Sequence, residues 1–222
     1  TNARDPSGLA FYAIVPAENV TKADHQLRSL VVSGETVNAV ARGLDAATFA
    51  WITDLLPRHE TFRKALQTAF NFVPFYLDAI LDDVGAERII YMDTDMIVTG
   101  DVEELATVDL QGHPVGAVVD CSQFFGHYFT NFTKVAKTAR SSALDYSRVT
   151  KRSCVFNRGI FVMDVSAWRR HHVAQEIEFW IRKHNSGARV WKDGISQPPW
   201  LLALQAIGYK KMSSSWNVRG PG

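Results

Sequence analysis

Short apolar runs alternate with amphipathic segments along much of the chain. Continuous apolar runs are typical of buried strands, and apolar positions three and four residues apart are typical of helices. Strands are therefore predicted at residues 11–15, 36–41, 88–92, 115–119 and 160–163, and helices at 21–31, 46–56, 102–105 and 173–181. Residues 62–81 predict two helices or one kinked helix, because Pro74 interrupts them. Strands that alternate with helices predict an α/β fold with a mainly parallel sheet and flanking helices.

Residues 121–153 depart from this alternation, because a polar and aromatic stretch is followed by a basic one. They predict a long excursion at the edge of the sheet, residues 121–154, with a cysteine at each end. Cys121 and Cys154 are the only cysteines. From this count alone, a disulfide and two buried thiols both remain open.

Composition narrows the class of protein. The chain has 222 residues, of which 46% are hydrophobic and 21% are charged, which predicts one globular domain. Its 24 Lys and Arg balance 23 Asp and Glu, which argues against nucleic acid or an anionic membrane as the main partner. No apolar run approaches the roughly 18 residues of a membrane span, so membrane attachment is expected only through a segment outside this chain.

Two Asn-x-Ser/Thr sequons, at Asn19 and Asn131, are candidate glycosylation sites. Together with the cysteine pair they indicate the secretory pathway. The first residue is Thr and the last four are Arg-Gly-Pro-Gly, so we expect a fragment of a longer protein.

The candidate chemistry lies where predicted strands end. Asp93 and Asp95 follow residues 88–92, Asp120 follows 115–119, and Asn157 precedes 160–163. Ligands of parallel α/β sheets bind beyond the carboxyl ends of the strands. Side chains at i and i+2 point the same way, so two carboxylates there converge on one Mg²⁺ or Mn²⁺, which suits a diphosphate. The alternative is a pair of turn-forming aspartates that cap a strand.

Other common chemistries have no sequence signal. The chain contains neither a Gly-x-Gly-x-x-Gly nor a Gly-x-x-x-x-Gly-Lys loop, and no Gly-x-Ser-x-Gly elbow. His171 and His172 are adjacent, and adjacent helical residues point about 100° apart, so they do not chelate one ion.

Residues 88–105 resemble the metal-binding segment of glycosyltransferase family 8. Three further segments match the family in the same order along the chain. Residues 157–168 are similar to its Asn-x-Gly strand and the tryptophan helix that follows. Residues 196–199 lie where the family has an Asp-Gln pair, and residues 216–220 are like the loop after that pair. The likeness is strongest to the eukaryotic "glycosyltransferase 8 domain-containing" branch, which has cysteines at both ends of the excursion. The resemblance covers residues 60–222 and makes the Cys121–Cys154 disulfide the expected state.

The resemblance implies a GT-A fold and retaining transfer of a sugar from a UDP-sugar to a hydroxyl group of a carbohydrate or glycoprotein acceptor, in the Golgi lumen. By analogy, Asp93 and Asp95 hold Mn²⁺ or Mg²⁺, with a third ligand, a C-terminal histidine, outside this chain. Gln197 would lie beside the anomeric carbon and polarise it. The residues expected to bind the nucleotide and donor sugar are Asn71, Asp93, Thr94, Asp95, Asp120, Asn157 and Gly159.

Some positions depart from the family pattern. Pro74 stands where the family commonly has an arginine, and Ser196 stands where the aspartate of the Asp-Gln pair is usual. The C-terminal His-x-x-Gly-x-x-Lys-Pro-Trp motif and the first nucleotide-binding strand are absent, so we expect a domain incomplete at both ends. These departures favour one alternative, a catalytically silent nucleotide- or glycan-binding protein with the same fold. Another alternative is a different metal-dependent nucleotide-sugar enzyme of GT-A fold, such as an inverting transferase or a pyrophosphorylase. An inverting transferase would need a carboxylate as general base, and this chain offers Gln197 there.

Overall fold

The computed structural model describes residues 8–29, 31–32, 35–36, 38–56, 67–131, 135 and 149–218. Contacts divide the chain into two compact units. One comprises Thr1–Asp54 with Ile97–Val108, and the other comprises Leu55–Met96 with Asp109–Gly222. All of the candidate residues around Asp93 belong to the second unit.

The first unit is built on a pair of parallel strands, β1 (Phe11–Pro16) and β4 (Ala39–Leu44). Helix α1 (Val20–Arg28) packs on β4, where a Cβ at Gly43 would lie 2.7 Å from Val20 Cγ2. The absence of a side chain at Gly43 therefore permits this close approach. The unit's other elements are η2 (Ala17–Asn19), β2 (Val31–Val32), β3 (Glu35–Thr36) and α4 (Glu103–Ala106), and α2 (Ala46–Leu55) ends at its boundary.

The second unit contains a four-stranded sheet in the order β5-β7-β6-β8. Its strands are β5 (Arg88–Met92), β6 (Val115–Phe124), β7 (Cys154–Asp164) and β8 (Lys210–Met212). The central β7 runs antiparallel to both of its neighbours, whereas β8 runs parallel to β6. Three strands therefore share one direction, and the first half of β7 lies beside the carboxyl ends of β5 and β6.

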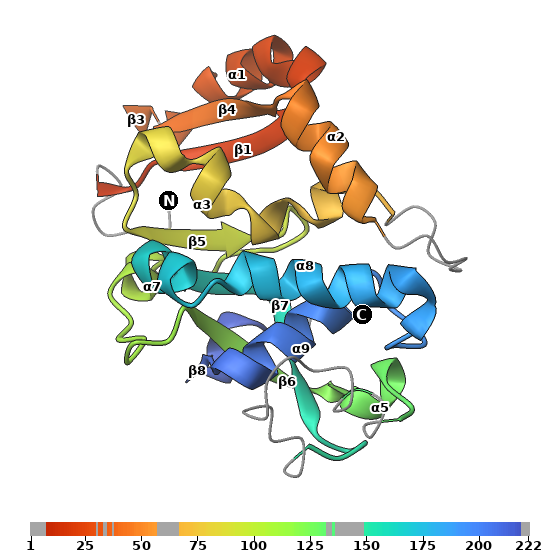
Figure 1. Ribbon diagram of the computed structural model, residues 1–222. Coiled ribbons are helices and arrows are strands. Elements are labelled where there is room, and N and C mark those ends of the chain that lie inside the picture. The colour runs from red at the N-terminus through yellow and green to blue at the C-terminus, as the bar shows by residue number, and fades with distance from the viewer. Residues whose placement is uncertain are drawn as a thin grey trace. The chain divides into compact units, whose positions relative to one another are not determined.

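Helices surround this sheet in the second unit. They are η4 (Ala69–Asn71), η5 (Val73–Phe75), α3 (Leu77–Ile80), η6 (Asp82–Val84), α5 (Phe125–Tyr128), α7 (Val165–Arg170), α8 (Val173–Lys183), η8 (His184–Ala188), α9 (Gln197–Ile207) and η9 (Ser214–Trp216). Helix α8 is amphipathic, with Val173, Ile177 and Trp180 buried, and it packs along α9 (Figure 1).

An aromatic core fixes the start of α9 against the sheet. The ring centroid of Trp200 lies 5.1 Å from that of Phe161 and 6.0 Å from that of Phe156, and both phenylalanines are on β7. It also contacts Phe75, at 5.1 Å, and Trp168, at 5.5 Å. Such aromatic pairs add to the free energy of burial. Because Gln197 begins the same helix, this packing also determines where its side chain lies.

Most predicted elements are confirmed with changed bounds. The prediction for residues 62–81 is wrong in its described part, which forms three short helical segments, η4, η5 and α3, and not two helices or one kinked helix. The strand predicted at 36–41 overlaps the end of β3 and the start of β4. Strand β6 continues to Phe124 and β7 begins at Cys154, so strands form both ends of the predicted excursion, with α5 between them. Helix α9 was not predicted, because its buried positions occupy every side and leave no amphipathic pattern. Residues 62–66, 132–134 and 136–148, which carry parts of the predicted helical segment and of the excursion, lie outside the described residues.

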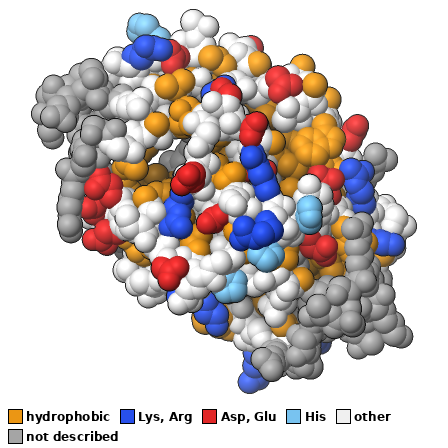
Figure 2. Space-filling model, turned by 60° about the vertical axis from the view of Figure 1, so that its left-hand side comes forward, with side chains coloured by type: hydrophobic (Ala, Val, Ile, Leu, Met, Phe, Trp, Pro, Cys, Tyr) orange, Lys and Arg blue, Asp and Glu red, His pale blue; other side chains and the backbone are white. Residues whose placement is uncertain are grey.

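A disulfide joins Cys121 to Cys154, with the two Cα atoms 4.5 Å apart, so this prediction is confirmed. Acidic and basic side chains are interspersed on the face that Figure 2 shows, as the near balance of charges suggests. Among the described residues, no helix is both long enough and apolar enough to span a membrane.

Candidate functional site

The candidate site begins at the carboxyl end of β5. Its ladder with β7 continues past Met92, since the Asp93 N–H donates to the Gly159 carbonyl at 2.7 Å. The Tyr91 hydroxyl donates to Asp93 Oδ1 at 2.6 Å, as strand alternation allows for residues two apart. Asp93 is half-buried, whereas Asp95 lies exposed in the following turn, as does Thr94. The first carboxylate is therefore held in place and the second remains accessible to a ligand.

Three polar side chains meet around Gly159. A Cβ at this position would lie 3.2 Å from Asp93 Oδ2, 3.2 Å from Asn157 Oδ1 and 3.8 Å from Asn217 Nδ2. Asn157 Oδ1 also accepts the Gly159 N–H at 2.8 Å. The Nδ2 of Asn217 is buried and has no hydrogen-bond partner within the described part of the chain. Groups from β5, β7 and the C-terminal segment thus converge where a side chain is absent.

Gln197 reaches the same strand from α9. Its Nε2 donates to the Phe156 carbonyl at 2.6 Å, one residue before Asn157. The first turn of α9 contains Pro198 and Pro199, which are favoured there because the first helical N–H groups have no partner within the helix. The structure therefore brings Gln197 to the segment that contains Asn157.

Asp120 lies on the neighbouring strand. It pairs in register with Val155, two positions along the ladder from the Val118–Asn157 pair. Its Oδ1 accepts hydrogen bonds from the backbone N–H and the hydroxyl of Ser122, at 2.8 and 2.6 Å. Asp120 thus belongs to the same edge of the sheet, with its carboxylate bonded to the irregular segment that follows.

Asn71 contacts the site through an arginine. The Arg158 guanidinium donates from Nη1 to the Asn71 carbonyl at 3.0 Å and from Nη2 to Asn71 Oδ1. Burial lowers the pKa of Arg158, while the nearby Tyr91 and Asp93 raise it. Burial, the hydrogen bond to Asp93 and the charges of Asp93 and Asp95 raise the pKa of Tyr91, so its hydroxyl remains a neutral donor.

Comparisons with known proteins agree on the family. The sequence matches the family described as "Glycosyl transferase family 8" over residues 8–222. The chain belongs to glycosyltransferase family 8. It is 33% identical over 162 residues to "Probable galacturonosyltransferase-like 3" of Arabidopsis thaliana, covering 73% of this chain and 44% of that protein. It is 26% identical over 175 residues to "Glycosyltransferase 8 domain-containing protein 2" of Macaca fascicularis, covering 74% of this chain and 49% of that protein. The chain thus spans less than half the length of these relatives.

A solved structure supports the fold of this family 8 chain. The galactosyltransferase LgtC, solved with donor and acceptor sugar analogues, aligns with a TM-score of 0.60 and 16% sequence identity, covering 92% of this chain and 63% of that one. The predicted GT-A fold is thereby confirmed. The sheet was predicted to be mainly parallel, and its four strands form a mixed sheet in which β7 runs antiparallel to β5 and β6.

The acidic pair of this family 8 chain fits a divalent cation. Asp93 and Asp95 offer carboxylate oxygens, the donors that Mg²⁺ and Mn²⁺ prefer. The space at Gly159 lies against Asp93 Oδ2, and Asn157 contributes an amide oxygen to the same place. The described residues contain no group of three or more His, Cys, Asp or Glu side chains arranged to hold a metal. Asp93 and Asp95 would therefore supply two carboxylates to a cation, fewer than such a group of three.

Three residues at the site had no assigned role from the sequence: Tyr91, Arg158 and Asn217. Tyr91 lies two positions before Asp93 in a strand, so alternation alone indicates a shared face. Arg158 lies within an irregularity of β7, between Asn157, which pairs with Val118, and Phe161, which pairs with Ala117. Simple alternation therefore does not predict the direction of its side chain. No local pattern connects Asn217 to β5.

A cavity of about 460 Å³ lies elsewhere in the second unit. Its residues are Asp78, Leu81, Asp82, Gly85, Ala86, Glu87, Ile89, Asp164, Val165, Ser166 and Arg169. Arg88 pairs with Asp164 at the amino end of β5, so the cavity is at the opposite end of this strand from Asp93.

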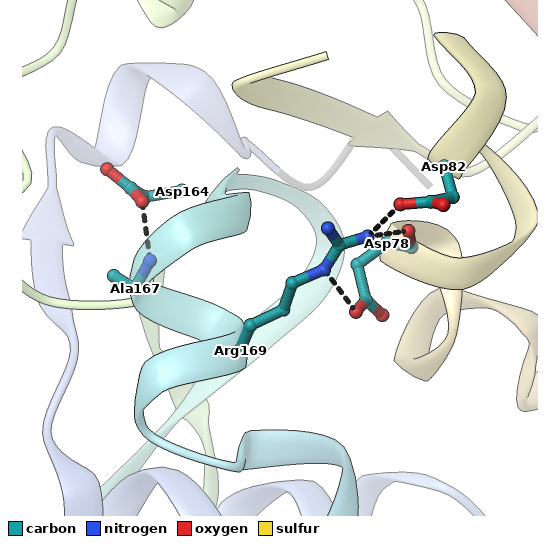
Figure 3. A network of polar contacts seen from close by, with 5 residues as sticks. All are labelled: Asp78, Asp82, Asp164, Ala167 and Arg169. Atoms are coloured by element: carbon teal, nitrogen blue, oxygen red, sulfur yellow. Dashed lines mark hydrogen bonds and ion pairs between the residues drawn. The ribbon is translucent and has the colours of Figure 1, made fainter. Parts of the chain in front are cut away.

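Arg169 pairs with two acidic side chains of this cavity, Asp78 and Asp82 (Figure 3). Arg169 donates from Nε to Asp78 Oδ2 at 3.2 Å and from Nη2 to Asp82 Oδ1 at 2.7 Å, which connects α7 with α3 and η6. Asp164 Oδ1 accepts the Ala167 N–H at 2.7 Å and caps α7. We therefore interpret this region as a structural junction.

Proposed function

We propose that this chain binds the donor in a retaining, metal-dependent transfer of a sugar from a UDP-sugar to a hydroxyl group of a carbohydrate or glycoprotein acceptor. The supporting observation is the convergence of Asp93, Asn157 and Asn217 around Gly159. Gln197 approaches the same strand from α9. Membership of family 8 supports sugar transfer itself.

In this proposal Asp93 and Asp95 hold Mn²⁺ or Mg²⁺. The cation, when bound, supplies positive charge that stabilises the departing diphosphate. Tyr91 orients Asp93 by its hydrogen bond of 2.6 Å. Asn157 and Gly159 line the donor-sugar pocket together with Asp120, and Thr94 belongs to the nucleotide-binding turn. Asn71 acts through Arg158, whose guanidinium it holds.

In this proposal Gln197 assists a transfer that retains the configuration at the anomeric carbon. An amide is too weak a nucleophile to form a stable covalent intermediate with the sugar. Its Nε2 is bonded to the Phe156 carbonyl, so the side chain is oriented and able to polarise the anomeric centre. The acceptor hydroxyl then attacks from the face that the diphosphate leaves, and its proton goes to the departing diphosphate. The protein contributes positioning and charge stabilisation.

The proposed compartment is the secretory pathway, specifically the Golgi lumen. The Cys121–Cys154 disulfide supports it, because disulfides persist in oxidising compartments. Asn19 is exposed in η2, and we propose it as an N-glycosylation site together with the exposed Asn131, whose following two residues lie outside the described part.

The first test is calorimetric titration of the purified protein with UDP in Mn²⁺, and then in EDTA. Binding that requires Mn²⁺ is expected, and Asp95→Ala should abolish it with little change in melting temperature, because Asp95 is exposed. Asp54→Ala, at another exposed aspartate, is the matched control and should bind normally. Loss of stability in Asp95→Ala without any effect on UDP binding would support the strand-capping alternative.

A donor panel follows, with UDP-galacturonate first because of the name of the Arabidopsis relative, and then UDP-galactose, UDP-glucose and UDP-xylose. Transfer or hydrolysis of one donor would support the enzyme. Metal-dependent UDP binding without turnover of any donor would favour the catalytically silent binding protein. A folded protein that binds no UDP would contradict the enzyme and would leave glycan binding as the remaining form of the silent alternative.

A further inference from the structure

A positively charged side chain lies within the acidic site. Arg158 stands between Asn157 and Gly159, the two β7 residues next to Asp93, and it is half-buried. Its guanidinium makes two hydrogen bonds to Asn71, one to the carbonyl at 3.0 Å and one to Oδ1. A planar guanidinium held by two bonds has little freedom to turn away.

This charge acts on the carboxylate that begins the acidic pair. The guanidinium interacts electrostatically with Asp93 and with Tyr91, the hydroxyl donor to Asp93. The backbone also brings Arg158 close to Asp93, because the carbonyl of the next residue, Gly159, accepts the Asp93 N–H at 2.7 Å. Arg158 is therefore a neighbour of the proposed cation site, and in the described part of the chain its guanidinium bonds to Asn71 and forms no direct ion pair with Asp93.

We propose that Arg158 is a fixed positive charge that opposes binding of the divalent cation alone and favours the cation bound together with a nucleoside diphosphate. This inference rests on the proposed function and specifies how the site selects its ligand. Two carboxylates and one guanidinium leave the site with a net negative charge. A bound divalent cation makes it net positive, and this charge attracts the diphosphate. Without the guanidinium, the same metal-loaded site would be neutral.

The sign of the effect separates this role from a structural one. Removal of the charge should strengthen Mn²⁺ binding about tenfold and weaken UDP binding at saturating Mn²⁺ about tenfold, the size of one interaction between partly buried charges. A residue that merely supports the fold would weaken both ligands when it is replaced. We would measure Mn²⁺ alone by electron paramagnetic resonance and UDP by calorimetry, with the melting temperature of each variant.

Two variants remove the charge in different ways. Arg158→Gln replaces the guanidinium with a neutral amide. Asn71→Asp keeps the acceptor atoms that Arg158 uses, and it neutralises the guanidinium by an ion pair at nearly constant volume, so it provides the test if Arg158→Gln does not fold. Arg158→Lys should retain the wild-type preference, because it keeps the charge. Arg152→Gln, at an exposed arginine of the same segment, is the matched control and should change neither affinity.

The outcomes distinguish this inference from the proposed function. If the wild-type protein binds no Mn²⁺ or UDP, the proposed function fails. If the wild type binds both, opposite changes in the two affinities support the role of Arg158. A folded Arg158→Gln or Asn71→Asp protein whose Mn²⁺ affinity is unchanged or lower overturns it, whatever happens to UDP.

Discussion

Gly159 is the position where a single methyl group should separate donor binding from folding. In Gly159→Ala the new Cβ would lie 3.2 Å from both Asp93 Oδ2 and Asn157 Oδ1, a few tenths of an ångström closer than ordinary contact. Neither neighbour moves freely. Asp93 accepts the Tyr91 hydroxyl at 2.6 Å, and Asn157 Oδ1 accepts the Gly159 N–H at 2.8 Å. The methyl group must therefore displace at least one of these oxygens.

The expected cost follows from the bonds at risk. A hydrogen bond to a charged group contributes about 1.5–3 kcal/mol. Displacement of Asp93 weakens such a bond without breaking the backbone pair to Gly159, so we expect the free energy of unfolding to fall by about 1–2 kcal/mol. The same displacement moves a proposed metal ligand. Since each 1.4 kcal/mol is a factor of ten in affinity, UDP binding in Mn²⁺ should weaken by roughly tenfold or more.

Calorimetry of UDP in Mn²⁺ and a thermal melt measure the two effects separately. Gly8→Ala is the matched control, because a Cβ there has no atom within 4 Å, and it should leave UDP affinity and stability near the wild-type values. Retention of full metal-dependent UDP affinity by a folded Gly159→Ala protein would refute the reasoning, because the crowded oxygens would then have no part in donor binding.

Three further predictions concern the second unit. Thiol titration of the denatured, unreduced protein should detect no free sulfhydryl, and two reactive thiols would contradict the disulfide. Replacement of Cys121 and Cys154 by serine should lower the free energy of unfolding by roughly 3–4 kcal/mol, because the disulfide closes a 33-residue separation. Tyr91→Phe removes the hydroxyl that orients Asp93 and should weaken Mn²⁺-dependent UDP binding about tenfold in calorimetry, and unchanged binding would exclude an orienting role. Arg169→Met removes exposed ion pairs at the opposite end of β5, so denaturant unfolding should show a loss of at most about 1 kcal/mol and UDP affinity should not change.

The acidic pair could be found from the sequence because its signal is local. A continuous apolar run predicts β5, and the alternation of side chains along a strand places Asp93 on the face of Tyr91. The family resemblance rests on ordered motifs, and it identified Asn157, Gly159 and Gln197 as candidates. The disulfide between Cys121 and Cys154 was likewise expected from the resemblance, whereas the residue count left it open.

Only the tertiary structure decided how these segments meet. The direction of β7 was not predicted, because a short apolar run does not encode whether a strand is parallel or antiparallel to its neighbour. That direction carries the first half of β7 to the carboxyl end of β5, and an irregularity in its pairing with β6 accompanies Arg158. Asn217 is more than fifty residues from Gly159 in the chain and still lies beside it. Periodicity reports which side chains share a face of one element, whereas packing between distant elements determines which faces come together.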